Sequence, residues 1–294
     1  MLFDESTLRK LNQLTLVASR LRSGAIKGER RSSKRGSSVE FADYRDYAPG
    51  DDLRRLDWNI YARLDRPFIK LLEEEEDLAV HILLDGSKSM DWPLEADSSL
   101  HKFRYAVRLA AGLGSVALAA GDSLSVGFLQ NGHVAAEFGP TRGQAALPRL
   151  FGFLEGLEPG GQTDLDAALK AYSITPRRAG LLVLISDLFD SAQDNLLRHL
   201  RQPHETVLLH LLAPDELNPP LAGDLQLVDS ETGSSQDVSL DGGLRSLYRE
   251  RAQAWVQSIQ ADCRKQSARY LNIVTDRPWE QVILREMRRA GMVK

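Results

Sequence analysis

The sequence predicts an α/β protein with a doubly wound, mainly parallel sheet that carries helices on both faces. From about residue 78 onward, largely apolar runs of strand length, such as 79–85 and 181–187, alternate with longer segments of helical periodicity. This alternation favours βαβ units that share one sheet. The 294 residues, 43% hydrophobic and 27% charged, suffice for one large domain with a small appendage.

The individual elements follow from the same patterns. Leucines at helical spacing predict an amphipathic helix over 4–22, and a basic stretch rich in glycine and serine over 23–38 predicts a mobile loop. Further along we expect strands at 79–85, 122–129, 181–187, 205–212 and 269–275, and helices at 98–120, 143–156, 164–173, 191–200, 242–268 and 278–290. The Asn131-Gly132 turn predicts a hairpin with 133–138, and a second hairpin is expected around 229–235.

The domain boundary is placed at residue 77. Residues 1–77 are expected to form an N-terminal helix, a basic loop and an appended module, and 78–294 to form the sheet domain. Residues 39–77 interleave aromatic residues with charges of both signs, which predicts a folded, hydrogen-bonded module. Within it, segment 40–63 is interpreted as a structural network that pins the module to the core, with a catalytic role as the alternative.

A strand is expected over 66–74, and alternation along it would split the acidic run 73–77 between two faces. We therefore interpret this run as charges that guard a strand edge or as partners for nearby arginines, rather than as a metal site.

Charge and cysteine content restrict the class of protein. The formal net charge is −4 and the pI is about 5.9, so the chain as a whole does not favour nucleic acid. The single cysteine, Cys263, cannot form a disulfide within the chain and is interpreted as a small core residue. The N-terminus lacks a signal-peptide pattern, and the most apolar helical segment (109–120) is too short to span a bilayer. We therefore expect a cytoplasmic protein with no membrane partner.

Oxygen-bearing side chains gather where two predicted strands end. Asp85, Ser87 and Ser89 follow the first strand, Asp187 ends a second, and Thr163 lies in a glycine-rich loop between them. Carboxylates and hydroxyls are hard ligands that suit Mg²⁺ or Mn²⁺. Parallel neighbouring strands would bring their carboxyl ends to one crevice. The alternative is that these residues only cap helices; Asp164, next to Thr163, is interpreted as such a cap.

These five positions resemble the metal-ion-dependent adhesion site of von Willebrand factor A domains in order and spacing. An upstream run adds a second resemblance: Glu40-Phe41-x-x-Tyr44-Arg45-x-Tyr47-x-Pro49-Gly50-Asp51-Asp52-x-Arg54-x-x-Asp57-Trp58. It is similar to a bacterial family of unknown function with a von Willebrand A-like domain, whose members are commonly encoded beside MoxR-type AAA+ ATPases. The resemblance implies an octahedral Mg²⁺ held by Asp85, Ser87, Ser89, Thr163 and Asp187.

The function that this resemblance implies is metal-dependent protein interaction, in which the ion binds an Asp or Glu side chain of a partner, with a MoxR-type ATPase as a candidate partner. The sequence contains no G-x-S-x-G elbow and no phosphate-binding loop, so we do not expect an enzyme. Two alternatives stay open. One is a Mg²⁺-dependent phosphoryl hydrolase with a strand-end carboxylate as nucleophile. The other is nucleic-acid binding through the basic stretch 22–35, which lacks interleaved aromatic residues and is not favoured.

Overall fold

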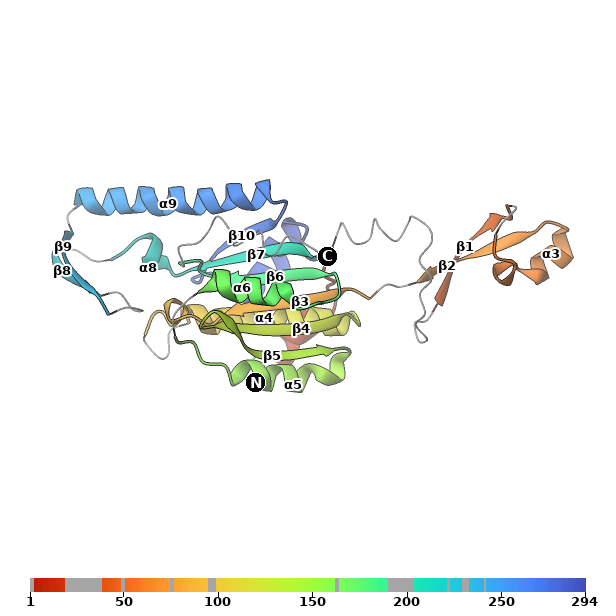
Figure 1. Cartoon of the computed structure of the whole chain (residues 1–294), viewed down its shortest axis with the longest axis horizontal. Coiled ribbons are helices and arrows are strands. Elements are labelled where there is room, and N and C mark those ends of the chain that lie inside the picture. Colours follow the sequence, from red (N-terminus) through yellow and green to blue (C-terminus); the bar gives the residue numbers. More distant parts are fainter. Residues whose placement is uncertain are drawn as a thin grey trace. The chain divides into compact units, whose positions relative to one another are not determined.

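The computed structural model describes residues 3–18, 39–48, 51–74, 77–94, 99–161, 164–189, 204–220, 223–228, 233–240 and 242–294. These residues form two compact units (Figure 1). The sheet domain contains the described residues of Met1–Ile26 together with those of Leu78–Lys294. The small unit contains the described residues of Lys27–Asp77.

A six-stranded sheet forms the centre of the sheet domain (Figure 1), in the strand order β10-β7-β6-β3-β4-β5. The strands are β3 (Ala79–Asp85), β4 (Ser123–Gln130), β5 (His133–Thr141), β6 (Leu181–Ser186), β7 (Glu205–Leu212) and β10 (Arg269–Val274). Neighbouring strands are parallel except β4 and β5, which form the antiparallel hairpin predicted at Asn131-Gly132. The predicted α/β class with a mainly parallel central sheet is confirmed.

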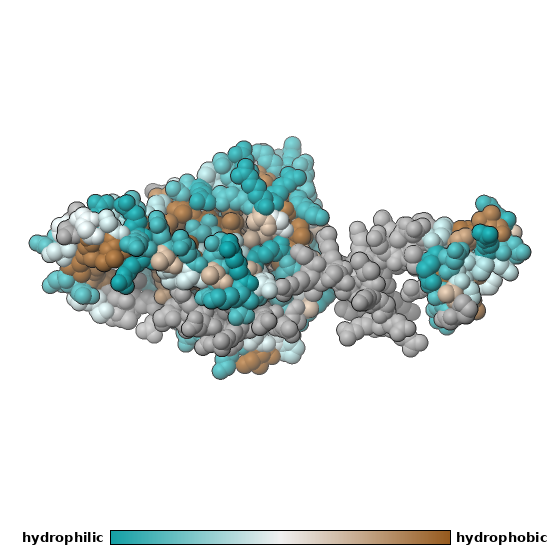
Figure 2. All heavy atoms as spheres, turned by 90° about the horizontal axis from the view of Figure 1, so that it is seen from above, coloured by the Kyte–Doolittle hydropathy of each residue, from teal (hydrophilic) through white to brown (hydrophobic). Residues whose placement is uncertain are grey.

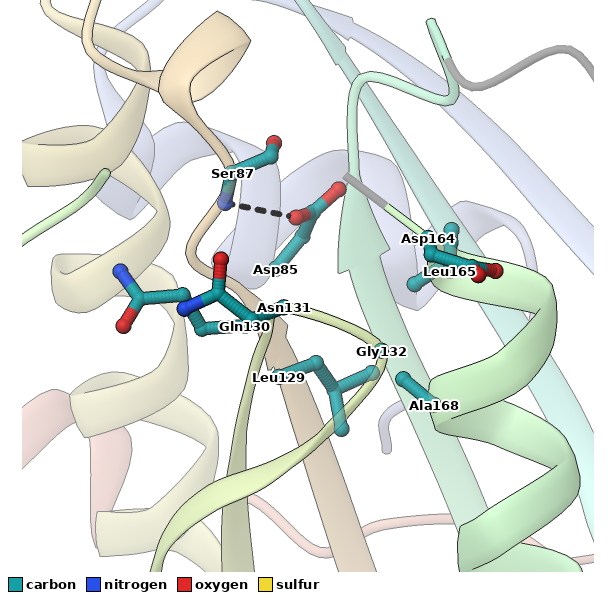
Figure 3. A pocket seen from close by; sticks show the side chains of 9 residues that line it. All are labelled: Asp85, Ser87, Leu129, Gln130, Asn131, Gly132, Asp164, Leu165 and Ala168. Carbon is teal, nitrogen blue, oxygen red and sulfur yellow. Dashed lines mark hydrogen bonds between the residues drawn. The ribbon is translucent and has the colours of Figure 1, made fainter. Parts of the chain in front are cut away.

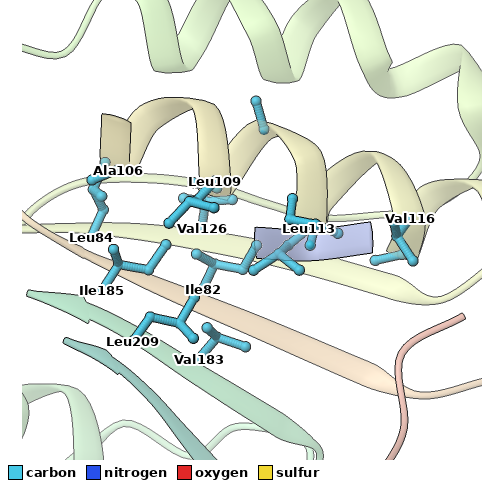
Figure 4. Close-up of a cluster of buried hydrophobic side chains, with 14 of the residues drawn as sticks. Ile82, Leu84, Ala106, Leu109, Leu113, Val116, Val126, Val183, Ile185 and Leu209 are labelled. Atoms are coloured by element: carbon cyan, nitrogen blue, oxygen red, sulfur yellow. The ribbon is translucent and has the colours of Figure 1, made fainter. Parts of the chain in front are cut away.

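One face of the sheet packs against α4 (Lys102–Ala119). Ile82 and Leu84 of β3 point toward Leu109 and Leu113 of this helix (Figure 4), and all four side chains are fully buried. Burying one such side chain contributes about 1.5–3 kcal/mol. The same cluster includes residues of α1 (Glu5–Leu11), α5 (Leu147–Glu155), α10 (Trp279–Gln281) and η4 (Val282–Met287).

The opposite face packs against α6 (Leu165–Ile174) and α9 (Gly242–Lys265). Leu83, the β3 residue between Ile82 and Leu84, belongs to this second cluster because successive strand residues point to opposite faces. Cys263 of α9 is fully buried here, as predicted, and burial raises the pKa of its thiol to about 12. Two separate apolar clusters therefore confirm that helices cover both faces of the sheet.

The chain between β7 and α9 contains one short helix and a hairpin. Helix α8 (Pro214–Leu217) was not predicted, whereas the antiparallel pair β8 (Gly223–Val228) and β9 (Ser235–Leu240) is the hairpin expected around 229–235. Hydrophobic surface gathers at the end of the sheet domain that carries this hairpin (Figure 2), where Leu227 and Val228 are exposed. Two further short helical turns are η2 (Lys88–Met90) and η3 (Gln144–Ala146).

The helix predicted over 4–22 is wrong in its length. Helix α1 ends at Leu11, and the chain continues as an extended segment that forms an isolated antiparallel bridge between Leu16 and Val293. Backbone hydrogen bonds of Thr15 with Lys294 and of Val17 with Met292 flank the bridge. Thr15 and Val17 are β-branched and favour extended backbone.

This segment also changes the predicted domain division. The predicted boundary at residue 77 sets all of 1–77 apart from the sheet domain, but the described residues of Met1–Ile26 belong to the sheet domain. Phe3 and Leu11 are buried in the cluster around α4, and Phe3 stacks on Trp279 with ring centroids 4.5 Å apart. The N-terminal residues are therefore part of the core.

Three other predicted helices differ in their bounds or cannot be compared. The helix expected from residue 98 begins at Lys102 because His101 caps it by accepting a hydrogen bond from the backbone N–H of Arg104. The helix expected over 278–290 contains the π-helical segment η4. The predicted helix 191–200 and basic stretch 23–38 lie outside the described residues.

The small unit is a folded, hydrogen-bonded module, as the sequence predicts. Its strands β1 (Val39–Asp46) and β2 (Phe68–Glu74) are antiparallel, and between them lie η1 (Leu53–Arg55) and α3 (Trp58–Leu64). Asp57 caps α3 by accepting hydrogen bonds from the backbone N–H groups of Asn59 and Ile60, and the Tyr44 hydroxyl also donates to it. Arg45 and Asp51 form an ion pair at 2.8 Å.

No helix in the described ranges combines the length and the apolar character needed to cross a bilayer.

Candidate functional site

The candidate site lies where the strand order of the parallel sheet reverses. After β4 and the edge strand β5 the chain crosses to the other side of β3 and continues with β6 and β7, so the reversal falls between β3 and β6. Leu84 is opposite Ile185 in this parallel pair, which places Asp85 beside the end of β6, close to Asp187. In open α/β sheets, ligands bind outside the carboxyl ends of the strands at such a switch point.

Asp85 is a buried carboxylate at the end of β3, with 2% of its surface exposed. One oxygen accepts a hydrogen bond from the backbone N–H of Ser87 at 2.9 Å (Figure 3), and the other accepts one from the Ser186 hydroxyl at 2.5 Å. Burial and the negative charge of nearby Asp187 raise the pKa of Asp85 to about 6 despite these hydrogen bonds. A carboxylate in this position gains from a nearby cation.

Ser87 and Ser89 connect the two strand ends. Their hydroxyl oxygens are 2.9 Å apart, and the Ser89 hydroxyl donates to Asp187 Oδ1 at 3.2 Å. Ser87 occupies the N-cap position of η2, but its side chain makes no capping hydrogen bond. The hydroxyl of Ser87 therefore points to the other site oxygens instead of serving as a helix cap.

Asp187 follows β6 and is fully buried. Its Oδ1 also accepts the backbone N–H of Phe189 at 3.2 Å, and its backbone carbonyl oxygen lies 3.0 Å from Nε2 of His210. Since the carbonyl can only accept, His210 donates from Nε2. Burial lowers the pKa of His210 to about 4, so this imidazole is neutral at pH 7 and orients the Asp187 backbone without adding charge.

The structure adds two charged residues that the sequence analysis missed. Lys102, at the start of α4, is fully buried, and its Nζ lies 2.5 Å from Asp187 Oδ2 and 2.5 Å from Glu216 Oε1 of α8. Burial by itself disfavours the ammonium, but the charges of Asp187 and Glu216 outweigh it and raise the pKa of Lys102. In the sequence Lys102 is only one of several basic residues at the start of a largely apolar helix, which does not identify its partners.

The loop that carries Thr163 is tied to the turn after β3. The N–H of Gly160 donates to the Gly86 carbonyl at 2.8 Å, and the N–H of Lys88 donates to the Gly161 carbonyl at 3.3 Å. Gly86 is required for close packing here, because a Cβ at this position would lie 2.1 Å from the Phe128 ring. Thr163, the fifth predicted ligand, lies outside the described residues.

A small pocket opens beside Asp85 and Ser87. Its other walls come from the β4–β5 turn and from the start of α6, with Asp164 and Leu165 across from Asp85 (Figure 3). Its cavity volume is about 10 Å³, which is room for about one water molecule or one bare ion. That is far below the roughly 300–1,000 Å³ of ordinary small-molecule sites. Asp164 caps α6 by accepting the N–H of Ala167 at 2.9 Å, as predicted.

The donor set that the structure brings together consists of two carboxylates and two hydroxyls, from Asp85, Ser87, Ser89 and Asp187. These hard oxygen atoms fit Mg²⁺ or Mn²⁺, with remaining positions left to water. Within the described part of the chain, no three His, Cys, Asp or Glu side chains gather into a group suited to a metal ion. A cation here would therefore depend on serine hydroxyls as well as carboxylates.

Exposed apolar side chains follow both strand ends of the site in the sequence. Trp92 is 40% exposed, Leu94 is 68% exposed and Phe189 is 46% exposed, and each lies within five residues of Ser89 or Asp187 in the sequence. The ammonium of Lys88, between Ser87 and Ser89, is paired with Asp91 at 2.5 Å.

Fold and site define a mixed α/β protein with clustered carboxylates and hydroxyls at the switch point of a mainly parallel sheet. The chain belongs to DUF58, a family of proteins of unknown function, whose family model matches residues 43–257.

Two mycobacterial proteins are similar in sequence to nearly the whole chain. The uncharacterized proteins Rv1480 of Mycobacterium tuberculosis and Mb1516 of Mycobacterium bovis are each 28% identical over 288 residues, which is 96% of this chain and 89% of theirs. The uncharacterized protein MAV169 of Mycobacterium avium is 31% identical over 135 residues, covering 45% of this chain and 80% of its own.

Two solved structures share a more distant likeness. The conserved hypothetical protein BatB from Bacteroides thetaiotaomicron aligns with a TM-score of 0.38 and 18% identity, covering 73% of this chain and 98% of its own. An aerotolerance-related membrane protein from Bacteroides fragilis aligns with a TM-score of 0.41 and 16% identity, covering 72% of this chain and 98% of its own.

Proposed function

We propose that this protein is a metal-dependent protein-interaction module built on a von Willebrand A-like domain. In this proposal Asp85, Ser87, Ser89, Thr163 and Asp187 hold Mg²⁺ or Mn²⁺, and the ion binds a carboxylate of a partner protein. The observation that carries the proposal is the meeting of Asp85 and Asp187 with two serine hydroxyls at one sheet edge.

The chemistry of the donors favours recognition over permanent metal storage. Serine and threonine hydroxyls are neutral ligands, so at most two carboxylates offset the charge of the ion. Mg²⁺ accepts near-octahedral oxygen ligands and usually keeps some waters. An Asp or Glu side chain from a partner can replace one of these waters and form a strong, directional bond to the ion. The metal thereby converts a buried acidic site into one that attracts an acidic ligand.

The surroundings of the site support a protein as the ligand. Trp92, Leu94 and Phe189 expose apolar surface on the segments that follow the site residues, and a protein surface can cover such side chains while it presents its carboxylate. A small acid would fill only the pocket and leave these side chains exposed. The proposed partner protein therefore presents one acidic side chain together with neighbouring apolar side chains.

The proposed partner class comes from the resemblance to proteins encoded beside MoxR-type AAA+ ATPases. We propose that the chain acts as an accessory of such an ATPase and recruits or recognises proteins for it. Described residues of the upstream motif fold into the small unit, which could present a second contact surface because Trp58 and Leu64 of α3 are more than 60% exposed.

The cation part of the proposal is tested by Mn²⁺ binding, measured through the electron paramagnetic resonance signal of free Mn²⁺. We expect saturable binding by the wild type, competition by Mg²⁺, and at least a tenfold loss in Asp85→Asn and in Ser89→Ala. Asp4→Asn is the matched control, because Asn caps a helix about as well as Asp and this exposed N-cap residue of α1 lies outside the site. Unchanged binding in Asp85→Asn would refute the site.

The partner part is tested with the purified MoxR-type ATPase encoded nearest to this chain in the same genome. Pull-downs compare wild type with Asp85→Ala, in Mg²⁺ and in EDTA. The proposal requires ATPase recovery that depends on both Mg²⁺ and Asp85. Equal recovery in all four samples would count against a metal-dependent contact, and no recovery in any of them would exclude this partner.

A further inference from the structure

Lys102 lies against the candidate cation site as a fixed internal cation. Its side chain is fully buried, and its ammonium contacts Asp187 Oδ2 and Glu216 Oε1, each at 2.5 Å. The ring of Phe189 covers it, with Nζ 4.8 Å from the ring centroid. These contacts hold the ammonium in place, so it cannot move into solvent when a metal ion arrives.

The oxygens of Asp187 are divided between two functions. Oδ1 faces Ser89 and the proposed metal position, whereas Oδ2 is bound to Lys102. Glu216 anchors the lysine from the far side and is itself held by the backbone N–H of Ala213 at 2.7 Å. Asp187 can therefore offer a metal only one oxygen, and much of its charge is already offset.

We propose that Lys102 is a positioning residue that lowers the cation affinity of the site, by acting as a permanent counter-ion of Asp187. This inference rests on the proposed cation site and concerns how that site is regulated. Two cations that share one carboxylate repel each other, and the repulsion is strong where water is excluded. With Asp187 half-neutralised, a divalent ion is held weakly, and a carboxylate from a ligand makes up the missing negative charge.

The net charge of the site suggests a variant that tests the effect of Lys102 on Asp187 alone. Asp85, Asp187, Glu216 and Lys102 together carry a net charge of two minus when all are ionised. The double variant Lys102→Met/Glu216→Gln removes one positive and one negative charge, so this net charge is unchanged. Only the local pairing of Asp187 differs. The double replacement also avoids leaving two buried carboxylates without a cation between them, which Lys102→Met alone would do.

The experiment measures the Mn²⁺ affinity of the full chain for wild type, Lys102→Met/Glu216→Gln and Lys102→Arg, with thermal unfolding as a check of folding. We expect at least tenfold tighter Mn²⁺ binding in the double variant, because Asp187 regains its full charge at the metal position. Lys102→Arg keeps the positive charge and is expected to stay within about threefold of wild type. Lys170→Met, an exposed lysine on α6, controls for the loss of a lysine elsewhere.

The outcomes separate this inference from the function it rests on. Tighter binding in the folded double variant that again requires Asp85 supports the inference. Equal or weaker binding in the folded double variant, beside a wild type that does bind Mn²⁺, overturns the inference and leaves the cation site standing. Absence of Mn²⁺ binding in every variant overturns both.

Discussion

Replacing Asp85 with Asn is expected to stabilise the metal-free protein. Burial and the charge of Asp187 raise the pKa of Asp85 from 3.8 to about 6. Ionising Asp85 therefore costs free energy in the folded protein that it does not cost in the unfolded chain. Because the folded-state pKa is the higher one, the wild type loses stability as pH rises from about 4 to above 6, and Asp85→Asn lacks this loss.

The magnitude follows from the two pKa values. A difference of about 2 corresponds to about 3 kcal/mol at pH 7.5, since each integer step is worth about 1.4 kcal/mol. The amide loses one interaction, because the Ser186 hydroxyl no longer donates to a carboxylate, which costs about 1 kcal/mol. We therefore predict a net gain of about 2 kcal/mol near pH 7.5. Near pH 4.5, where most Asp85 is protonated, the gain falls to about zero.

Urea unfolding in EDTA at the two pH values measures this difference directly. Asp164→Asn, at the exposed N-cap of α6, is the control and is expected to change the unfolding free energy by less than about 0.5 kcal/mol. Two results would refute the reasoning: an Asp85→Asn protein no more stable than wild type near pH 7.5, or a gain of the same size at both pH values. A confirmed gain would show that Asp85 is retained at a cost in stability.

Three further predictions concern other residues. Ser89→Ala should leave the unfolding free energy within about 1 kcal/mol of wild type, so that a loss of Mn²⁺ binding in this variant is separable from unfolding. An NMR titration of the His210 ring protons should give a pKa below about 5, and a normal value near 6.5 would contradict its burial as a neutral donor to Asp187. Leu16→Ala should destabilise the protein by about 2–5 kcal/mol in urea unfolding, whereas Leu64→Ala, at an exposed position, should cost less than about 0.5 kcal/mol; equal effects would argue against the packed N-terminal segment.

The central sheet was predictable because its strands carry strong local signals. Parallel strands that are buried on both faces are mostly apolar, and the resulting runs place β3, β6 and β7 within about one residue of their true bounds. The half-buried edge strand β10 was predicted with similar accuracy. The prediction of the N-terminal helix was wrong beyond Leu11, where the sequence signal for a helix was weakest. Leu14 and Leu16 continue an apolar pattern that fits a helix, but they are buried by contacts with the far end of the chain.

The same distinction applies to the site. Asp85 and Asp187 each end an apolar strand, so once the two strands are taken as parallel neighbours their meeting follows from local sequence alone. The contacts of Lys102 with Asp187 and Glu216 span 85 and 114 residues of sequence. No periodicity or motif in the sequence predicts contacts between residues this far apart along the chain. Strand periodicity in this chain therefore specifies the sheet and the position of its acidic edge, whereas only three-dimensional packing brings a buried lysine against that edge.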